Sequence, residues 1–179
     1  MAFDTSLVTR SAGTDHGATR HGPERYPQQL LGEQEYDGHA SVHDDAVAGD
    51  LGLSGAPIEG PTHFSQIDPL AFDVWGRRWF ETGCISAHFL NMVVEGESVT
   101  AVLTPTSPDG ARIDAVSGAV GGDGAPVLTG TATVDPAAPT ELGERLVKMQ
   151  TRDPGELFIV DQVEVGPVPG AAPVVSVDL

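Results

Sequence analysis

The amino-acid sequence predicts an α+β domain in which an antiparallel sheet is covered by one long helix. Apolar side chains recur at spacings of three and four between residues 62 and 75, which is the period of an amphipathic or nearly buried helix. After Gly76 the pattern changes to β-branched runs joined by short turns, as in an antiparallel meander. The apolar face of such a sheet needs cover, and the upstream helix is the obvious candidate.

The N-terminal part of the chain predicts only short elements. A strand is expected over residues 3–9. Residues 11–25 have no apolar periodicity and are rich in Gly, Thr, His and Arg, which favours a loop or a disordered arm. A helical turn is expected near residues 28–35, and one or two turns of helix over residues 44–51. We therefore expect residues 1–24 to form a partly flexible arm.

The long helix has clear start and stop signals. Either Pro61 or Thr62 can open it, because proline suits the first helical position and threonine suits the cap. Pro69 lies inside the run and must kink or divide it, since proline lacks the N–H group that a helix interior requires. Gly76 is the expected end.

Four β-rich runs follow the helix, over residues 85–93, 98–103, 112–120 and 126–134. The segment Glu95-Gly96-Glu97 is the size of a hairpin turn and is expected to join the first two runs. The aromatic and methionine side chains of this part are expected in the core or at an interface: Trp75, Trp79, Phe80, Phe89 and Met92.

Residues 25–136 are expected to form the main domain, and residues 137–179 a C-terminal extension. The extension predicts a helix followed by a strand within residues 155–166. One face of this helix carries Leu142, Leu146 and Met149.

Charge and composition exclude several classes of partner. The 179 residues carry a formal net charge of −17, which disfavours binding to nucleic acid or to an anionic membrane surface. An anionic ligand would need a local basic patch, and Arg77–Arg78 is the one adjacent basic pair. The single cysteine, Cys84, excludes an intrachain disulfide.

The same features favour a cytoplasmic bacterial protein. Eight arginines accompany one lysine, and Gly, Ala, Val, Asp and Pro are abundant, which is typical of a GC-rich bacterial genome. The N-terminus has neither a basic nor an apolar leader region, and no apolar run approaches membrane-spanning length.

The stretch from His39 to Pro61 is the candidate site. It places histidines and aspartates just upstream of a Gly/Pro turn into the long helix, which suits either an acid/base site or a solvated acidic loop. His39 and His43 are four residues apart, as helical zinc ligands can be. The residues between them do not favour a helix and no third ligand is evident, so we expect no metal and no cofactor.

Two motifs in this stretch resemble the MaoC-like hotdog family of (R)-specific enoyl-CoA hydratases and acyl dehydratases. Val42-His43-Asp44-Asp45 is similar to the end of the family's loop G-D-x-N-P-[LIV]-H-x-D. Ala56-Pro57-Ile58-Glu59-Gly60-Pro61 is similar to its turn G-P-I-x-H-G. The segments GCISAHFLNMVVEGESV and DAVSGAVGGDGAPVLTGTATV resemble its strand pair and closing hairpin, so the likeness covers about residues 36–135. The resemblance implies a hotdog fold, a sheet wrapped around one central helix.

The resemblance also implies residue roles, with departures. His43 falls on the catalytic histidine, but Gly38 falls on the aspartate, and Asp37 lies one residue away. Gly60 replaces the histidine of the second motif, and Pro61 its glycine. His43 would be the general base or would orient water, with Asp37 as its carboxylate partner, or Asp45 if the loop folds differently.

Substrate contacts are expected around the turn. The backbone N–H groups of Gly60 and Thr62 would face the thioester oxygen, where negative charge grows. Glu59 and His63 flank the turn and would point into the cleft. The alternatives are a loop-anchoring role for His43, a turn or cap role for Asp37, and for His63 a histidine whose hydrogen bonds are satisfied in the first helical turn.

The implied activity is (R)-specific enoyl hydration or 3-hydroxyacyl dehydration on an acyl-CoA or acyl-carrier thioester. The family also implies a homodimer, which would pair or cover an exposed edge strand. Two other functions stay open: a hotdog protein that binds an acyl ligand without chemistry, and a thioesterase that uses Glu59 or Asp37.

Overall fold

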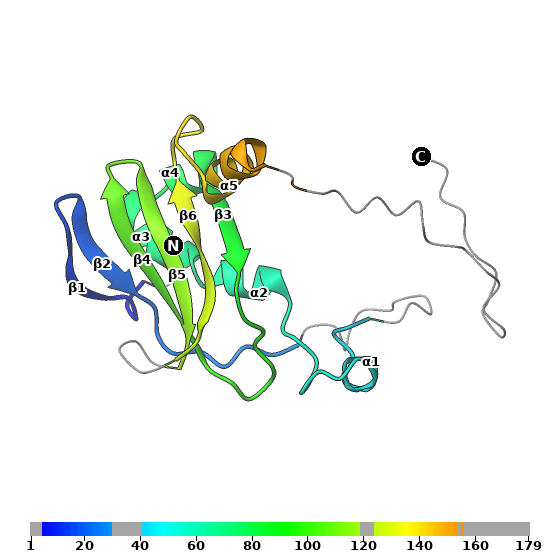
Figure 1. Ribbon diagram of the computed structural model, residues 1–179. Helices are drawn as coiled ribbons and strands as arrows, with labels where there is room; N and C mark the ends of the chain where they lie inside the picture. The colour runs from blue at the N-terminus through cyan, green and yellow to red at the C-terminus, as the bar shows by residue number, and fades with distance from the viewer. Residues whose placement is uncertain (1–4, 30–40, 119–123, 154, 156–179) are drawn as a thin grey trace.

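The computed structural model describes residues 5–29, 41–118, 124–153 and 155. Its six strands form one antiparallel sheet in the order β1-β2-β4-β5-β6-β3 (Figure 1). The strands span Thr9–Thr14 (β1), Gly17–His21 (β2), Cys84–Phe89 (β3), Val99–Ser107 (β4), Gly110–Ser117 (β5) and Pro126–Thr133 (β6). The helices span Asp45–Asp50 (α1), Gly60–Ser65 (α2), Asp68–Trp75 (α3), Arg78–Thr82 (α4) and Glu141–Thr151 (α5).

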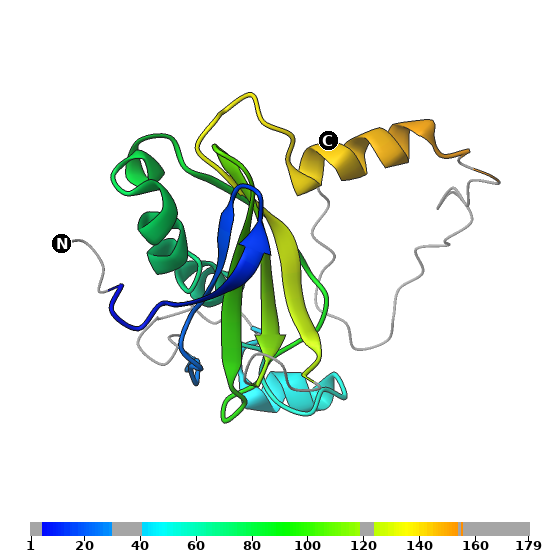
Figure 2. The ribbon, with the colours of Figure 1, turned by 90° about the vertical axis from the view of Figure 1, so that its left-hand side faces the viewer.

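The predicted α+β hotdog class is confirmed by this arrangement. In the helical segment between β2 and β3, α3 lies against one face of the antiparallel sheet, as Figure 2 shows. Among the described residues, no helix is both long enough and apolar enough to span a bilayer.

The central helix is divided where the sequence predicts a break. α2 ends at Ser65, and α3 begins at Asp68 with Pro69 in its first turn. Proline is tolerated there because the first helical N–H groups have no partner within the helix. Gly76 ends α3 with a φ of 57°, a conformation that glycine adopts without the steric cost of a Cβ atom. The structure adds the short helix α4, which the sequence did not predict.

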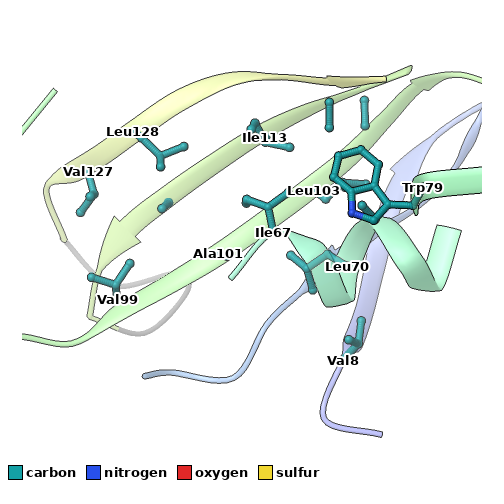
Figure 3. Packing of buried hydrophobic residues seen from close by; sticks show 14 of the residues in the cluster. Val8, Ile67, Leu70, Trp79, Val99, Ala101, Leu103, Ile113, Val127 and Leu128 are labelled. Atoms are coloured by element: carbon teal, nitrogen blue, oxygen red, sulfur yellow. The ribbon is translucent and has the colours of Figure 1, made fainter. Parts of the chain in front are cut away.

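The core lies between α3 and the inner face of the sheet (Figure 3). Ile67 and Leu70 are fully buried and belong to one cluster with Leu103 and Ile113 of the sheet. Trp75 and Trp79 are buried at the far end of the helical segment, and their rings stack with centroids 5.8 Å apart. The expected core role of these two tryptophans is confirmed, whereas Phe80, Phe89 and Met92 are 52%, 43% and 46% exposed.

The prediction of a loop or disordered arm over residues 11–25 is wrong for most of this segment. β1 and β2 form a hairpin, and β2 continues the sheet by pairing Arg20 with Leu103 of β4. Asp73 of α3 ties the hairpin to the helix, because its carboxylate accepts hydrogen bonds from Arg10 at 2.6 Å and Arg20 at 3.0 Å. The strand expected over residues 3–9 is also wrong from residue 5 to residue 8, where the chain turns before β1.

The expected hairpin between the first two β-rich runs is wrong as well. β3 pairs with β6 at one edge of the sheet, from Cys84 opposite Thr133 to Phe89 opposite Leu128, and β4 lies three places away. The chain leaves the sheet after Phe89. Val93 is then buried, and its carbonyl accepts the Ile58 N–H at 2.7 Å. The segment that was expected to continue a strand therefore anchors the approach to α2.

The helix expected in the C-terminal extension is confirmed as α5, which Thr140 caps by accepting the Gly143 N–H. Its predicted apolar face is exposed rather than packed. The further strand expected within residues 155–166 and the helical turn expected near residues 28–35 fall mainly outside the described residues.

Candidate functional site

Two neighbouring aspartates fix α1 and its connection to the segment that enters α2. Asp44 caps α1, because its Oδ1 accepts the N–H groups of Ala46 and Val47 at 2.9 and 3.2 Å. Asp45 Oδ1 accepts the Ala56 N–H at 2.9 Å and so ties α1 to the segment that enters α2. The structure therefore gives Asp45 an anchoring contact in the loop.

His43 is held by the same segment. Its Nδ1 lies 2.6 Å from the carbonyl oxygen of Pro57, and the ring is half-buried. A carbonyl oxygen can only accept, so Nδ1 must carry the hydrogen and donate it. In the neutral ring, Nε2 is then the unprotonated nitrogen and can accept a proton.

The Pro57 carbonyl oxygen accepts hydrogen bonds from two side chains. Gln29 Nε2 donates to the same oxygen at 3.1 Å, and the Gln29 backbone N–H donates to Glu95 at 2.8 Å. Residues far apart in the chain therefore fix the position of the His43 ring. The sequence pattern gave no signal for Gln29, because it lies in a polar segment without periodicity.

Asp37, the predicted partner of His43, lies outside the described residues, as do Gly38 and His39. Its pairing with His43 stays a prediction.

The side chain of Glu59 lies in an unusual environment for a carboxylate. It occupies the cap position of α2, but its side chain makes no capping hydrogen bond. Both carboxylate oxygens are buried and have no hydrogen-bond partner. Burying a carboxylate without partners is costly, and such groups concentrate at functional sites.

His63 follows Glu59 by one helical turn. It is only 3% exposed, and its Nδ1 is buried without a hydrogen-bond partner. Burial lowers the pKa of the His63 imidazole, and the Glu59 carboxylate acts in the opposite direction by raising that pKa.

Gln66 completes a row of buried polar groups on α2. It is 7% exposed, and its Oε1 also lacks a partner. Glu59 is the N-cap of α2, His63 lies within the helix and Gln66 is its C-cap; we call these three residues the α2 polar stripe. Their spacing of four and three residues was visible in the sequence, but the apolar period of the same run concealed it.

The turn around Gly60 is tightly packed. A Cβ atom on Gly60 would lie 2.9 Å from the ring of Phe89, so this position needs glycine unless the ring moves. The Phe89 ring also lies 6.4 Å from the His63 ring and 5.5 Å from the Phe64 ring, measured between centroids. Phe89 therefore covers the start of the polar stripe, a role the sequence did not indicate.

The amides of this turn differ in availability. The Thr62 N–H donates to the Glu59 carbonyl at 3.0 Å, and Pro61 has no N–H. The expected role of the Thr62 amide toward a thioester oxygen is therefore not supported by this geometry, and Gly60 is the remaining predicted donor.

The predicted basic patch is engaged in ion pairs. Arg77 pairs with Glu81 at 2.9 Å, and Arg78 pairs with Asp109 at 2.8 Å, both on the surface. Within the part of the chain that the structure describes, no three His, Cys, Asp or Glu side chains are grouped so that they could hold a metal ion.

Comparison with known proteins adds distant likenesses only. No family model matches the chain, and no curated protein matches its sequence. An (R)-hydratase from A. caviae involved in PHA biosynthesis is 18% identical with a TM-score of 0.45, and the match covers 68% of this chain and 96% of that one.

Two thioesterase structures are also similar. A mutant 4-hydroxybenzoyl CoA thioesterase complexed with 4-hydroxybenzoyl CoA is 11% identical, with a TM-score of 0.37 and coverage of 64% of this chain and 80% of that one. A mutant thioesterase from Pseudomonas aeruginosa is 13% identical, with a TM-score of 0.30 and coverage of 70% and 79%. The strand order and the helix placement of this chain are themselves those of the hotdog fold.

Proposed function

We propose that this hotdog protein acts on acyl thioesters, adding water to an enoyl thioester or removing it from a 3-hydroxyacyl thioester with (R) specificity. One observation carries the proposal: the Pro57 carbonyl accepts the hydrogen on His43 Nδ1 at 2.6 Å. This contact fixes the tautomer and leaves Nε2 as a base for water.

The step assigned to His43 is proton removal. As the water oxygen bonds to C3 of the enoyl group, His43 Nε2 takes the proton that the water loses. Electron density moves through C2 to the thioester oxygen, which needs a hydrogen-bond donor. C2 then takes the proton from His43, so that the C2–H bond forms and one water molecule is added in total. The Gly60 amide is the proposed hydrogen-bond donor to the thioester oxygen, and Asp37 is the proposed carboxylate partner of His43.

We propose an acyl-CoA or acyl-carrier thioester as the substrate and a homodimer as the assembly. β3 is an edge strand of the described sheet and pairs only with β6. Exposed sheet edges are commonly paired or covered, and a second copy of this chain would do so.

The experiment is an assay of the purified protein with crotonyl-CoA, followed by loss of enoyl absorbance. His43→Gln keeps a polar side chain but cannot act as the base, so we expect kcat to fall about 10²- to 10⁴-fold. The matched control is His16→Gln, because His16 is exposed in the turn between β1 and β2.

The possible outcomes distinguish the proposed function from its alternatives. Unchanged turnover in His43→Gln would remove His43 from the mechanism. Release of free CoA by the wild-type protein would indicate thioester hydrolysis instead. Binding of crotonyl-CoA without any turnover would support the non-catalytic alternative.

A further inference from the structure

The β1–β2 hairpin carries a serine and a histidine that the proposed function does not use. The hairpin lies at the edge of the sheet opposite to β3 (Figure 1). Arg10 and Arg20 of this hairpin reach Asp73 of α3, so both project toward the helix layer. Successive side chains of a strand point to opposite faces of the sheet. Ser11 and His21 therefore project away from the helices, on the outer face of the hairpin.

Ser11 and His21 are joined by a short hydrogen bond. The Ser11 Oγ lies 2.7 Å from His21 Nε2 and 3.4 Å from the carbonyl oxygen of Ala12. A hydroxyl group has a single hydrogen, and the much shorter contact favours Nε2 as its acceptor. In the neutral ring, Nδ1 then carries the hydrogen. This is the arrangement in which a histidine takes the proton from a serine that attacks a carbonyl carbon.

The other ring nitrogen of His21 is not satisfied by the hairpin. Nδ1 is buried and has no hydrogen-bond partner among the described residues. Buried polar groups normally have partners, so holding the ring in this position costs stability. Nε2, at the other side of the ring, contacts the hydroxyl of Ser11, which is an exposed residue. The ring is thus held where it can exchange a proton with a group that solvent and substrate can reach.

Thr9 places a third polar group beside this pair. It is the cross-strand partner of His21, so the Cβ atoms of the two residues are about 5 Å apart. Ser11 follows Thr9 by two residues and lies on the same face of β1. Thr9 is exposed, and its hydroxyl has no hydrogen-bond partner within the described parts of the chain. This hydroxyl is therefore free to donate to an oxygen on which negative charge develops.

A surface depression gives a small molecule access to these groups. Its volume is about 330 Å³, at the lower end of the range for small-molecule sites, and Thr9, Ser11, His21 and Glu24 all line it. The Glu24 carboxylate and the net charge of −17 disfavour an anionic substrate at this position. The depression therefore fits a small ester without negative charge.

We propose that Ser11 and His21 form a second active site, which hydrolyses small uncharged esters through an acyl-serine intermediate. Ser11 Oγ bonds to the ester carbonyl carbon while its proton moves to His21 Nε2, and the Thr9 hydroxyl donates to the carbonyl oxygen. The bond to the leaving alcohol then breaks, and the alcohol departs with the proton from Nε2. Water attacks the acyl group in the same way, so that the carboxylic acid is released and Ser11 regains its proton. One ester and one water give one acid and one alcohol.

The first test is hydrolysis of p-nitrophenyl acetate by the full chain, followed by release of p-nitrophenolate. Ser11→Ala and His21→Gln should each lower the rate above the buffer background by about 10²- to 10⁴-fold. Thr9→Val keeps the shape of the side chain but removes the donor, so it should lower kcat at least about tenfold. The matched controls are Ser54→Ala and His16→Gln, two exposed residues outside the depression, and both should keep the wild-type rate.

A covalent probe identifies the nucleophile. A fluorophosphonate transfers its phosphonyl group to the oxygen of an activated serine, and the serine proton leaves with fluoride as HF. The wild-type protein should gain the mass of one phosphonyl group on the peptide that contains Ser11, and Ser11→Ala should gain none. His43→Gln should be labelled like the wild type, because the two proposed sites share no residue. For the same reason, Ser11→Ala should hydrate crotonyl-CoA at the wild-type rate.

The outcomes keep this inference separate from the function proposed above. Wild-type ester hydrolysis in Ser11→Ala, or a probe attached to another residue, would overturn it. Full labelling of Ser11 in His21→Gln would overturn it as well, because the histidine would then not be the base. A wild-type protein that neither hydrolyses the ester nor takes up the probe would overturn it and leave the His43 proposal untouched. Ser11 is exposed, so Ser11→Ala should unfold at the wild-type urea midpoint; if His21→Gln does not fold, Ser11→Ala decides.

Discussion

α2 and α3 follow each other in the chain, but the side chains that they bury differ in polarity. α3 buries Leu70, Ala71 and Trp75, and the Trp75 indole N–H is satisfied by the Pro108 carbonyl at 3.0 Å. α2 buries His63 with a ring nitrogen left free. Apolar side chains in complete contact stabilise a fold, whereas free polar atoms in the same environment destabilise it. The contrast separates the part of the helical segment that holds the sheet from the part we assign to chemistry.

The largest expected effect lies in α3. Leu70→Ala removes a fully buried side chain that packs against the sheet, so the free energy of unfolding should fall by about 2–5 kcal/mol. Urea unfolding followed by circular dichroism measures this loss. A loss below about 1 kcal/mol would show that the core can close around the gap, and the contrast with α2 would weaken.

The second effect compares two buried carboxylates that differ in their partners. Asp73 of α3 is paired with Arg10 and Arg20, whereas the Glu59 oxygens have no partner. Asp73→Asn should therefore lower the free energy of unfolding by about 1–3 kcal/mol, because it weakens charge-assisted hydrogen bonds that tie the β1–β2 hairpin to α3.

The matched surface control is Arg77→Gln, whose ion pair with Glu81 is exposed on both sides and should contribute about 0.5 kcal/mol or less. Equal urea midpoints for Asp73→Asn and the control would mean that the hairpin does not depend on Asp73.

The sequence was sufficient for the elements that local chemistry determines. Pro69 divides the helical segment because its ring nitrogen cannot donate, and Asp44 starts α1 because its carboxylate accepts two amides. It was not sufficient for β1 and β2. In this hairpin only Thr19 is buried, so no alternation of apolar and polar residues announced the strands.

Pairing between distant strands was also beyond local patterns. Gly96, with a φ of 89°, does make a turn, as its neighbours predicted, yet β3 pairs with β6 rather than with β4. In the site, motif position drew attention to His43 and Glu59. What distinguishes His43 is its hydrogen bond to the Pro57 carbonyl, and what distinguishes Glu59 is that its buried oxygens have no partner. Both features depend on tertiary packing.

The third effect is a pH dependence that belongs to α2. Burial lowers the pKa of His63 in the folded protein below its ordinary value of 6.5, so between these two pKa values the unfolded chain binds more protons. The contribution of neutral His63 to stability is therefore complete above pH 6.5 and is lost as the pH falls toward the lower pKa of the folded state. Asp68 contributes with the opposite sign and at lower pH, because burial raises the pKa of its carboxyl group above the ordinary 3.8.

Urea midpoints measured at pH 7.5 and 5.5 for the wild type, His63→Gln and His16→Gln isolate the contribution of His63 to the pH dependence of stability. The midpoint of His63→Gln should fall less with acidification than that of the wild type, and His16→Gln should follow the wild type. A His63→Gln protein as acid-sensitive as the wild type would contradict the depressed pKa.

The smallest effect concerns α5, whose apolar spacing resembles that of α3 but whose side chains remain in solvent. Leu146 is 51% exposed, while Leu70 is fully buried, although both lie on helices with apolar residues on one face. α5 is fixed to the sheet through polar contacts, since Ser86 accepts the Leu142 N–H at 2.8 Å. Leu146→Gln should therefore change the free energy of unfolding of the monomeric protein by no more than about 0.5 kcal/mol. A loss as large as that of Leu70→Ala, measured at a protein concentration where the chain is monomeric, would show that α5 packs in solution in the way α3 does, and the distinction between a covered and an uncovered helix face would fail.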